Sequence, residues 1–272
     1  MTILVPLRSA LFNVWFVLVT IVVAGTGTPC RWSSVPETAA NPRRLAGLLS
    51  RGFLRLFSRW NALRFAQVWA GLLLDGARVI CGIRVVVTGR EHLPPGGPML
   101  IASQHQSAFD TLIWLRLMPR VAYVFKAELS RVPLFGPLLI PAGQIPVERG
   151  GINAVRTLLR GGDRAKADNR QIVVFPEGTR VRPGEDVPLR PGIALLAKRT
   201  GLPVIPVSTD SGLLWGRRAF NKRPGVIHIA IGPPIPPDLP QAEMLAALQA
   251  SWRSMGTAIA VDKSVHEPVP TL

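Results

Sequence analysis

The residues with the clearest capacity for chemistry are His105 and Asp110, which lie five positions apart in the run QHQSAFD (104–110). On a continuous helix this spacing would put the two side chains about 140° apart, so they can meet only across a turn. Imidazole is the side chain best suited to proton transfer near neutral pH, and a carboxylate on its other ring nitrogen fixes the tautomer and stabilises the imidazolium. The pair therefore predicts a general base and its orienting carboxylate.

The same segment also allows other roles. Asp110 has the chemistry of an N-cap for a helix that starts near Thr111, and His105 could be a loop histidine whose hydrogen bonds are satisfied. Ser107 could be a covalent nucleophile, although no Gly-x-Ser-x-Gly elbow surrounds it. An isolated His-x4-Asp pair favours the structural roles, and only the other motifs of the chain reverse that preference.

The second informative block is VVFPEGTR (173–180), in which a β-rich run ends at a proline. Glu177, Gly178, Thr179 and Arg180 then follow one another. The guanidinium of Arg180 can bind phosphate through a planar bidentate fork, and Glu177 could hold that fork or bind a substrate hydroxyl. The alternative is a turn with a surface ion pair of little energetic value.

Two weaker signals lie between these blocks. The strand-like run GQIPVER (143–149) ends in Arg149, and Lys126 lies just past another strand, before the apolar loop PLFG (133–136). A solvated surface cation is the default explanation for each one alone.

The elements that must position these residues have the pattern of an α/β domain from Ile83 onward. Since His105 and Asp110 fall at a strand-to-helix junction, that junction provides the required turn. The expected strands are 84–87, 99–102, 122–125, 144–147, 172–175, 203–207 and 226–231, and the expected helices are 111–118, 152–169, 192–200 and 241–260.

The N-terminal region is expected to associate with a membrane. The uncharged run 10–24 would span roughly 22 Å as a helix, short of a hydrocarbon core of about 30 Å, and extending it back would include Pro6 and Arg8. A signal peptide is the competing interpretation. Residues 48–60 carry arginines at i, i+4 and i+8, as in a helix lying in an interface, whereas residues 69–82 fit a core helix almost as well as a membrane helix. We therefore expect a membrane-anchoring helical region at 1–82, a catalytic domain at 83–260 and a flexible tail at 261–272.

Composition narrows the function class. The chain has 272 residues, 32 Lys and Arg against 16 Asp and Glu, a net charge of +16 and 48% hydrophobic residues. A chain both basic and apolar indicates an anionic membrane surface and anionic substrates, and no stretch resembles a nucleic-acid-binding module. The two cysteines and four scattered histidines form no pattern typical of a disulfide framework or a metal site.

Together these blocks resemble the glycerolipid acyltransferases typified by 1-acylglycerol-3-phosphate (lysophosphatidate) acyltransferase. His105-x4-Asp110 matches the first motif, 143–149 the second, FPEGTR (175–180) the third and VIPV (204–207) the fourth, and the resemblance covers roughly 83–237. It implies a mixed, mostly parallel sheet flanked by helices. Pro146 departs from the second motif, because it has no N–H to donate to an oxyanion.

The resemblance also implies roles. His105, oriented by Asp110, would deprotonate the sn-2 hydroxyl of 1-acylglycerol 3-phosphate as it attacks acyl-CoA or acyl carrier protein, with no acyl-enzyme and no further cofactor or metal. Arg149, Glu177 and Arg180 would bind the glycerol phosphate, Gly178 and Thr179 would shape that site, and Lys126 would add a phosphate contact.

Two alternatives remain open. The acceptor could be another lyso-lipid, such as a lyso-ornithine lipid, or glycerol 3-phosphate. The chain could also be a non-catalytic protein that binds anionic lipid. The presence of all four chemically active side chains, those of His105, Asp110, Glu177 and Arg180, disfavours this alternative.

The excess of arginines after the first apolar run predicts that the catalytic domain lies on the cytoplasmic side of a bacterial inner membrane.

Overall fold

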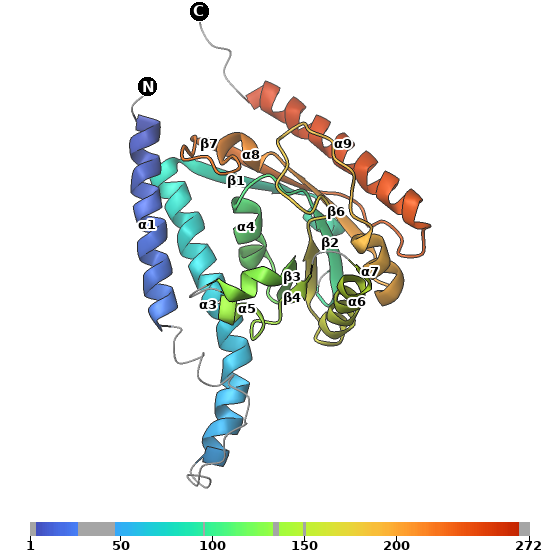
Figure 1. Cartoon of the computed structure of the whole chain (residues 1–272). Coiled ribbons are helices and arrows are strands. Elements are labelled where there is room, and N and C mark those ends of the chain that lie inside the picture. Colours follow the sequence, from blue (N-terminus) through green and yellow to red (C-terminus); the bar gives the residue numbers. More distant parts are fainter. Residues whose placement is uncertain (1–3, 27–46, 95, 133–135, 149–150, 267–272) are drawn as a thin grey trace, which may run out of the picture.

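A computed structural model describes residues 4–26, 47–94, 96–132, 136–148 and 151–266, and of residues 24–26, 47–61, 137–138, 151–152 and 262–266 it describes the backbone alone (Figure 1). The described strands form one sheet, and each confirms an expected strand to within a residue or two. They are β1 (Ile83–Thr88), β2 (Met99–Ser103), β3 (Val121–Lys126), β4 (Ile145–Val147), β5 (Gln171–Val174), β6 (Val204–Thr209) and β7 (Gly225–Ile231).

The strand order is β1-β7-β6-β2-β5-β3-β4, and every pair of neighbours is parallel except β6 and β7. This confirms the mixed, mostly parallel sheet. Because β6, β2 and β5 are adjacent and parallel, their carboxyl ends meet at one edge of the sheet. Pro146 lies in β4 at the edge of the sheet, where a missing N–H is tolerated.

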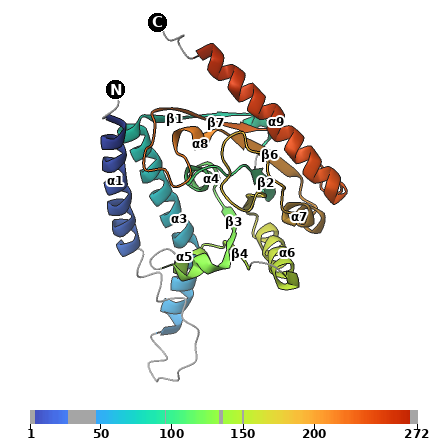
Figure 2. The ribbon, with the colours of Figure 1, turned by 45° about the horizontal axis from the view of Figure 1, so that its top comes forward.

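Helices cover both faces of the sheet (Figures 1 and 2). On one face pack α3 (Gly47–Cys81) and α4 (Phe109–Leu117), with α1 (Leu4–Thr26) outside α3; on the other lie α6 (Gly151–Ala167), α7 (Gly192–Thr200) and α9 (Gln241–His266). Side chains alternate accordingly. Ile101, Val173 and Ile205 join the core of the first face, and Leu100, Ile172 and Val204 that of the second.

Several short elements were not expected from the pattern. They are α5 (Gly136–Leu139), α8 (Ser211–Leu214) and the 3-10 turns Arg90–His92 and Ala127–Arg131. The long helices also differ from expectation at their ends. Helix α9 continues past Ala260 to His266, so residues 261–266 belong to the helix and not to a tail.

Helix α1 is longer than the apolar run predicted. It contains 23 residues and is therefore about 34 Å long, enough to cross a hydrocarbon core. Pro6 lies in its first turn, where a backbone N–H has no intrahelical partner and its absence costs little. Among the described residues, Leu4–Val23 is the one segment long and apolar enough to span a membrane.

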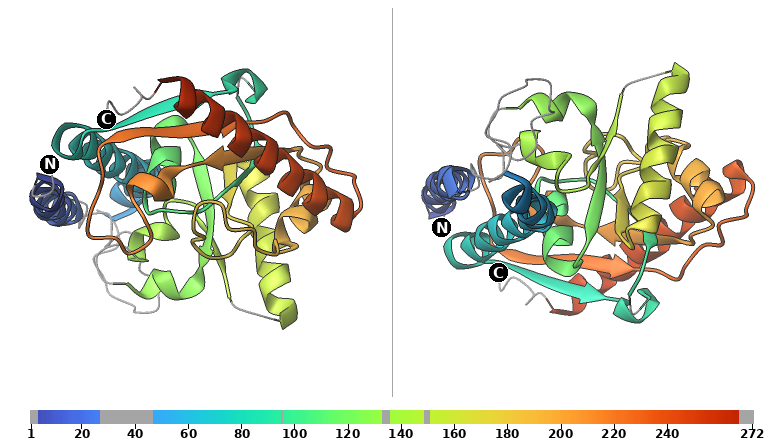
Figure 3. Two further views of the ribbon diagram at one scale, coloured as in Figure 1. Left: turned by 90° about the horizontal axis from the view of Figure 1, so that it is seen from above. Right: turned by 90° about the horizontal axis from the view of Figure 1, so that it is seen from below.

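Helix α1 also packs on the rest of the protein, as the end-on views show (Figure 3). The Phe12 side chain is fully buried and meets the ring of Trp215 edge-on, with 5.1 Å between centroids. The buried Lys222 reaches α1 as well, because its ammonium donates to Asn13 Oδ1 at 2.6 Å and its backbone N–H donates to Ser9 Oγ at 2.8 Å. This packing favours a retained helix over a signal peptide.

Helix α3 settles the choice left open for residues 69–82. Its buried side chains Ala70, Leu73, Ala77 and Cys81 recur at helical spacing along one face, which packs on α1 and α4. That half of α3 is thus a core helix. The interfacial segment predicted at 48–60 is helical, and its arginine side chains lie outside the described part of the chain.

Candidate active site

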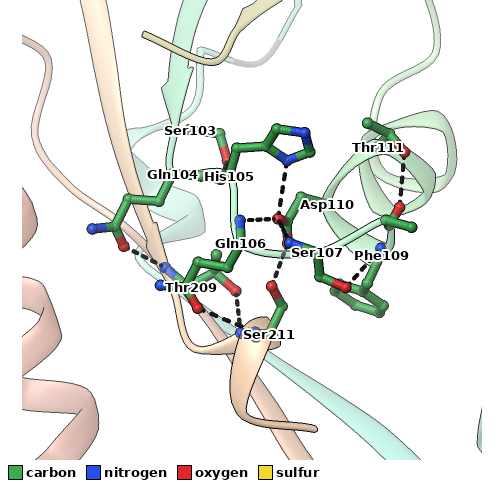
Figure 4. A network of polar contacts seen from close by, with 12 residues as sticks. Ser103, Gln104, His105, Gln106, Ser107, Phe109, Asp110, Thr111, Thr209 and Ser211 are labelled. Carbon is green, nitrogen blue, oxygen red and sulfur yellow. Dashed lines mark hydrogen bonds and ion pairs between the residues drawn. The ribbon is translucent and has the colours of Figure 1, made fainter. Parts of the chain in front are cut away.

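The predicted turn exists between β2 and α4. His105 leaves the end of β2, and Asp110 lies in the first turn of α4, so that the distance from His105 Nδ1 to Asp110 Oδ2 is 3.3 Å (Figure 4). The same oxygen accepts the backbone N–H groups of Gln106 and Ser107, each at 2.7 Å. The carboxylate thus holds together both the turn and the histidine.

The structure changes two of the alternative assignments. Helix α4 starts at Phe109, before Asp110, so the carboxylate reaches back to the turn and is not a plain N-cap. Ser107 is completely buried, and its hydroxyl accepts the backbone N–H of Phe109 at 3.1 Å. A hydroxyl in this position organises the start of a helix and is not presented to a substrate.

The orientation of His105 is that of a general base. When Nδ1–H donates to Asp110, the second ring nitrogen, Nε2, carries a lone pair. Figure 4 shows this nitrogen directed away from the hydrogen-bond network. The imidazole is 14% exposed, so it is accessible at one edge. It stacks on the ring of Phe175, with centroids 4.2 Å apart, which restrains its rotation.

The third motif contacts the first through hydrogen bonds to the backbone of His105. The carboxylate of Glu177 accepts the backbone N–H of His105 at 2.6 Å, and the N–H of Val181 donates to the carbonyl of His105 at 2.8 Å. No hydrogen bond joins Glu177 to Arg180 in the described structure. In this structure the Glu177 carboxylate contacts the loop of His105 and not the arginine fork, and its predicted contact with a substrate hydroxyl stays a prediction.

Burial has a strong effect on Glu177. Desolvation raises its pKa from 4.5 to about 8, opposed by the hydrogen bond from the His105 amide and assisted by the negative charge of Asp110. The side chain is only 8% exposed. The buried position of Glu177 thus favours its neutral, protonated form.

The remaining residues of the third motif face outward. Gly178 has φ +69°, a left-handed conformation that favours glycine, and its N–H closes a turn onto the carbonyl of Phe175 at 2.9 Å. Thr179 is exposed, and Arg180 is half-buried. Burial lowers the pKa of Arg180; Asp110 opposes this, and the charges of Arg217 and Arg218 add to it.

Two arginines not anticipated from the sequence thus lie close to Arg180. Arg217 donates through Nη1 to the backbone carbonyl of Arg180 at 3.3 Å, and both Arg217 and Arg218 are exposed. They come from the loop between α8 and β7, far from the third motif in sequence. The three guanidiniums therefore concentrate positive charge around Arg180.

The second motif is less closely connected. Lys126 ends β3 and is exposed, and β3 is separated from β2 by β5, which corresponds to about 10 Å at normal strand spacing. Arg149 lies outside the described residues. The structure therefore brings His105, Asp110, Glu177 and Arg180 together and leaves Lys126 farther along the same sheet edge.

Comparison with known proteins identifies the family. A family model described as Acyltransferase matches residues 84–210. The 1-acyl-sn-glycerol-3-phosphate acyltransferase of Pseudomonas aeruginosa is 31% identical over 212 residues, covering 76% of this chain and 82% of that protein. This chain belongs to the 1-acyl-sn-glycerol-3-phosphate acyltransferase family. The enzyme of that name from Limnanthes douglasii is 32% identical over 58% of this chain and 57% of its own length. The human alpha enzyme is 29% identical over 61% of this chain and 59% of its own length.

The fold of this acyltransferase agrees with a solved structure. The crystal structure of the 1-acyl-sn-glycerophosphate (LPA) acyltransferase from Thermotoga maritima superposes with a TM-score of 0.68, covering 93% of this chain and 97% of that one at 20% identity. The family match ends at Asp210, so α8 and the arginines after it lie beyond the matched residues.

Proposed function

We propose that this protein transfers an acyl group from an acyl thioester to the sn-2 hydroxyl of 1-acylglycerol 3-phosphate, forming phosphatidate. The observation that carries the proposal is the His105–Asp110 pair at 3.3 Å, with the second ring nitrogen directed away from the network. The names of the family relatives, all 1-acyl-sn-glycerol-3-phosphate acyltransferases, support the choice of substrate.

In the proposed reaction the acceptor hydroxyl attacks the thioester carbonyl while His105 Nε2 takes its proton. Asp110 stabilises the imidazolium that forms. The tetrahedral intermediate then collapses, the carbon–sulfur bond breaks, and the imidazolium returns the proton to the leaving thiolate. The buried Ser107 fits no covalent step, which supports direct transfer without an acyl-enzyme.

The phosphate of the acceptor is proposed to bind at Arg180. A guanidinium offers two parallel N–H donors to a phosphate, and Arg217 and Arg218 add positive charge close to it. Lys126 and Arg149 remain proposed further contacts. We also propose Thr179, which is exposed beside Gly178, as a contact to the same headgroup.

Substitution of Arg180 tests this assignment. Arg180→Lys keeps the charge and loses the bidentate fork, so the KM for 1-acylglycerol 3-phosphate should rise about tenfold or more while the KM for the acyl donor stays close to wild type. Arg90→Lys, an exposed arginine in the 3-10 turn after β1, is the matched control. A raised KM for the donor alone would assign Arg180 to the donor site.

Membrane binding is proposed through the outer face of α1. Apart from Arg8, the described exposed side chains of this helix are apolar, and the large ones are Leu4, Leu7, Leu11, Val14, Val17, Leu18, Ile21 and Val22. Transfer of such a face from water into lipid is favourable, and anionic lipid would attract the basic chain. The arginine excess after α1 favours a cytoplasmic catalytic domain, where acyl-CoA and acyl carrier protein occur.

The experiment is a substrate panel. Membranes containing the protein are incubated with a labelled acyl-CoA or acyl carrier protein and, separately, with 1-acylglycerol 3-phosphate, a lyso-ornithine lipid and glycerol 3-phosphate, and products are identified by mass spectrometry. The proposal predicts labelled phosphatidate as the main product. Acylation of another acceptor with no phosphatidate would replace the substrate, and no acylation of any acceptor would support a lipid-binding role.

A further inference from the structure

Asp110 has a hydrogen-bond partner on a distant part of the chain. Its Oδ2 atom serves His105 and the two turn amides, whereas Oδ1 accepts the hydroxyl of Ser211 at 2.6 Å (Figure 4). Ser211 is completely buried and Asp110 is 2% exposed, so water does not compete for this contact. We propose that Ser211 is a positioning residue for the His105–Asp110 pair, acting through Asp110 Oδ1.

The hydroxyl is held in this direction by its surroundings. The backbone N–H of Ser211 donates to Thr209 Oγ1 at 3.2 Å, and the N–H of Gly212 donates to Gln106 Oε1 at 3.1 Å. The neighbouring Asp210 contacts both the backbone N–H and Nδ1 of His228 on β7, each at 2.8 Å. The start of α8 is thus connected to β7, to β6 and to the catalytic turn.

The contact also has a reason in the topology. Because β6 lies beside β2 and parallel to it, the residues that follow β6 arrive next to the turn that follows β2. Backbone N–H groups hold this junction, since Gln104 N–H donates to the carbonyl of Val207 at 3.0 Å and the N–H of Thr209 donates to Gln104 Oε1 at 3.2 Å. This junction orients the Ser211 hydroxyl toward Asp110 Oδ1, the carboxylate oxygen that accepts no hydrogen bond from the turn.

The chemical effect follows from the charge of the pair. A donor to Oδ1 favours the form of the pair that carries negative charge on Asp110 and a neutral imidazole, which is the form that accepts a proton from the substrate. Without that donor, the protonated pair is favoured. The acidic limb of the pH–rate profile should then move to higher pH, and kcat at neutral pH should fall.

Other titratable groups face the pair, and the test must separate their effects. Glu177 and Arg180 approach from the loop after β5, Tyr123 approaches from β3, and the Asp210–His228 pair lies beside Ser211. None of these residues is altered in a Ser211 variant. If the acidic limb of the pH–rate profile moves in a Ser211 variant and stays in place in a control variant at the same junction, the change is assigned to the Ser211 hydroxyl.

The experiment compares Ser211→Thr with Ser211→Val, which have nearly the same volume and differ in the hydroxyl. This inference rests on the proposed acyltransferase activity, so wild type and His105→Ala are assayed beside them, and failure of wild type itself would overturn the activity and not this role alone. Ser211→Ala and the control Ser208→Ala, which loses a buried hydroxyl bonded to Gln104, complete the set.

The proposal predicts that Ser211→Ala and Ser211→Val lower kcat by about tenfold or more, since both remove a hydrogen bond to a charged group. Both should leave KM nearly unchanged and move the acidic limb of the pH–rate profile to higher pH. Compared with Ser211→Val, Ser211→Thr should have a higher kcat and an acidic limb closer to that of wild type. Ser208→Ala should leave the limb in place. Equal behaviour of the Thr and Val variants, or an unmoved limb in Ser211→Ala, would overturn the proposal.

Discussion

At the scale of single residues, the site contains two carboxyl groups in very different surroundings. Asp110 accepts four donors, from His105, Gln106, Ser107 and Ser211, which suits a carboxylate. Glu177 accepts one donor, the His105 amide, in a desolvated position. These different surroundings fit the proposed division of tasks, in which Asp110 supports proton transfer and Glu177 holds the loop.

Glu177 should make the stability of the protein dependent on pH. Its pKa is raised from 4.5 to about 8 in the folded state, so between these values the folded protein binds a proton that the unfolded chain releases. The contribution of this group to the free energy of unfolding therefore falls as pH rises from about 4.5 to 8. Glu177→Gln keeps an acceptor for His105 N–H and removes the titration.

Thermal unfolding between pH 5 and 9 measures this effect. The melting temperature of wild type relative to Glu177→Gln should decrease as pH rises through that window. The exposed Glu185→Gln is the matched control and should show no such trend relative to wild type. A constant difference between wild type and Glu177→Gln at every pH would contradict the prediction.

At the scale of elements, the sequence pattern was enough to predict the described strands of the sheet, because runs such as 99–102 and 172–175 are apolar and bounded by turn residues. It also predicted the turn between His105 and Asp110. Helix α1 was underestimated, because Pro6 and Arg8 interrupt an apolar pattern that the backbone continues. The short α8 has too few residues to produce a periodic signal.

The partners of the His105–Asp110 pair could not be predicted in the same way. Ser211 and Arg217 approach the site only because β6 is placed next to β2 in the sheet, and strand order is a long-range property of the fold. Likewise Glu177 could be identified as a motif residue, but its contact with the His105 amide depends on the way two loops meet. Local sequence therefore predicted the chemistry better than it predicted the contacts.

The junction between α1 and the catalytic domain has its own prediction. The ammonium of Lys222 donates to Asn13 Oδ1 at 2.6 Å and lies within 6 Å of the rings of Phe12, Trp215 and Phe220, and burial lowers its pKa. In a double-mutant cycle, Lys222→Met and Asn13→Leu should show a coupling energy of about 1–2 kcal/mol in thermal or denaturant unfolding. Additive effects of the two substitutions would show that the contact does not stabilise the junction.

At the scale of the whole molecule, α1 has two faces with separate tasks. Its outer side carries exposed apolar residues, and its inner side places Phe12 and Val19 in the same core as α3 and α4. The helix is therefore part of the folded domain as well as the proposed anchor. Removing it should affect both stability and membrane attachment.

Deletion of residues 1–28 tests both tasks. The sequence predicts that the basic stretch after α1 keeps some truncated protein on anionic membranes at low salt and releases it at high salt, since surface Lys and Arg contribute about 1 kcal/mol each. The structure adds that the truncated protein should unfold at lower temperature. Phe12→Ala, which leaves the outer face intact, should cost about 3–5 kcal/mol without weakening attachment.

Fractionation across a salt series and thermal unfolding provide the readouts. Full solubility of the truncated form at low salt would show that α1 is the sole anchor. An unchanged melting temperature in both the truncated form and Phe12→Ala would contradict the packing of α1 on the domain.

The most direct measurement is the rate of phosphatidate formation from 1-acylglycerol 3-phosphate by purified His105→Ala compared with wild type, at saturating substrates and with the fold of both checked by thermal unfolding. Loss of a general base should lower the rate by about 10² to 10⁴-fold or more while the melting temperature stays close to that of wild type. Asp110→Asn should also be severely impaired, because a neutral amide cannot compensate the imidazolium charge. Turnover by His105→Ala near the wild-type rate would contradict the proposal that His105 is the general base.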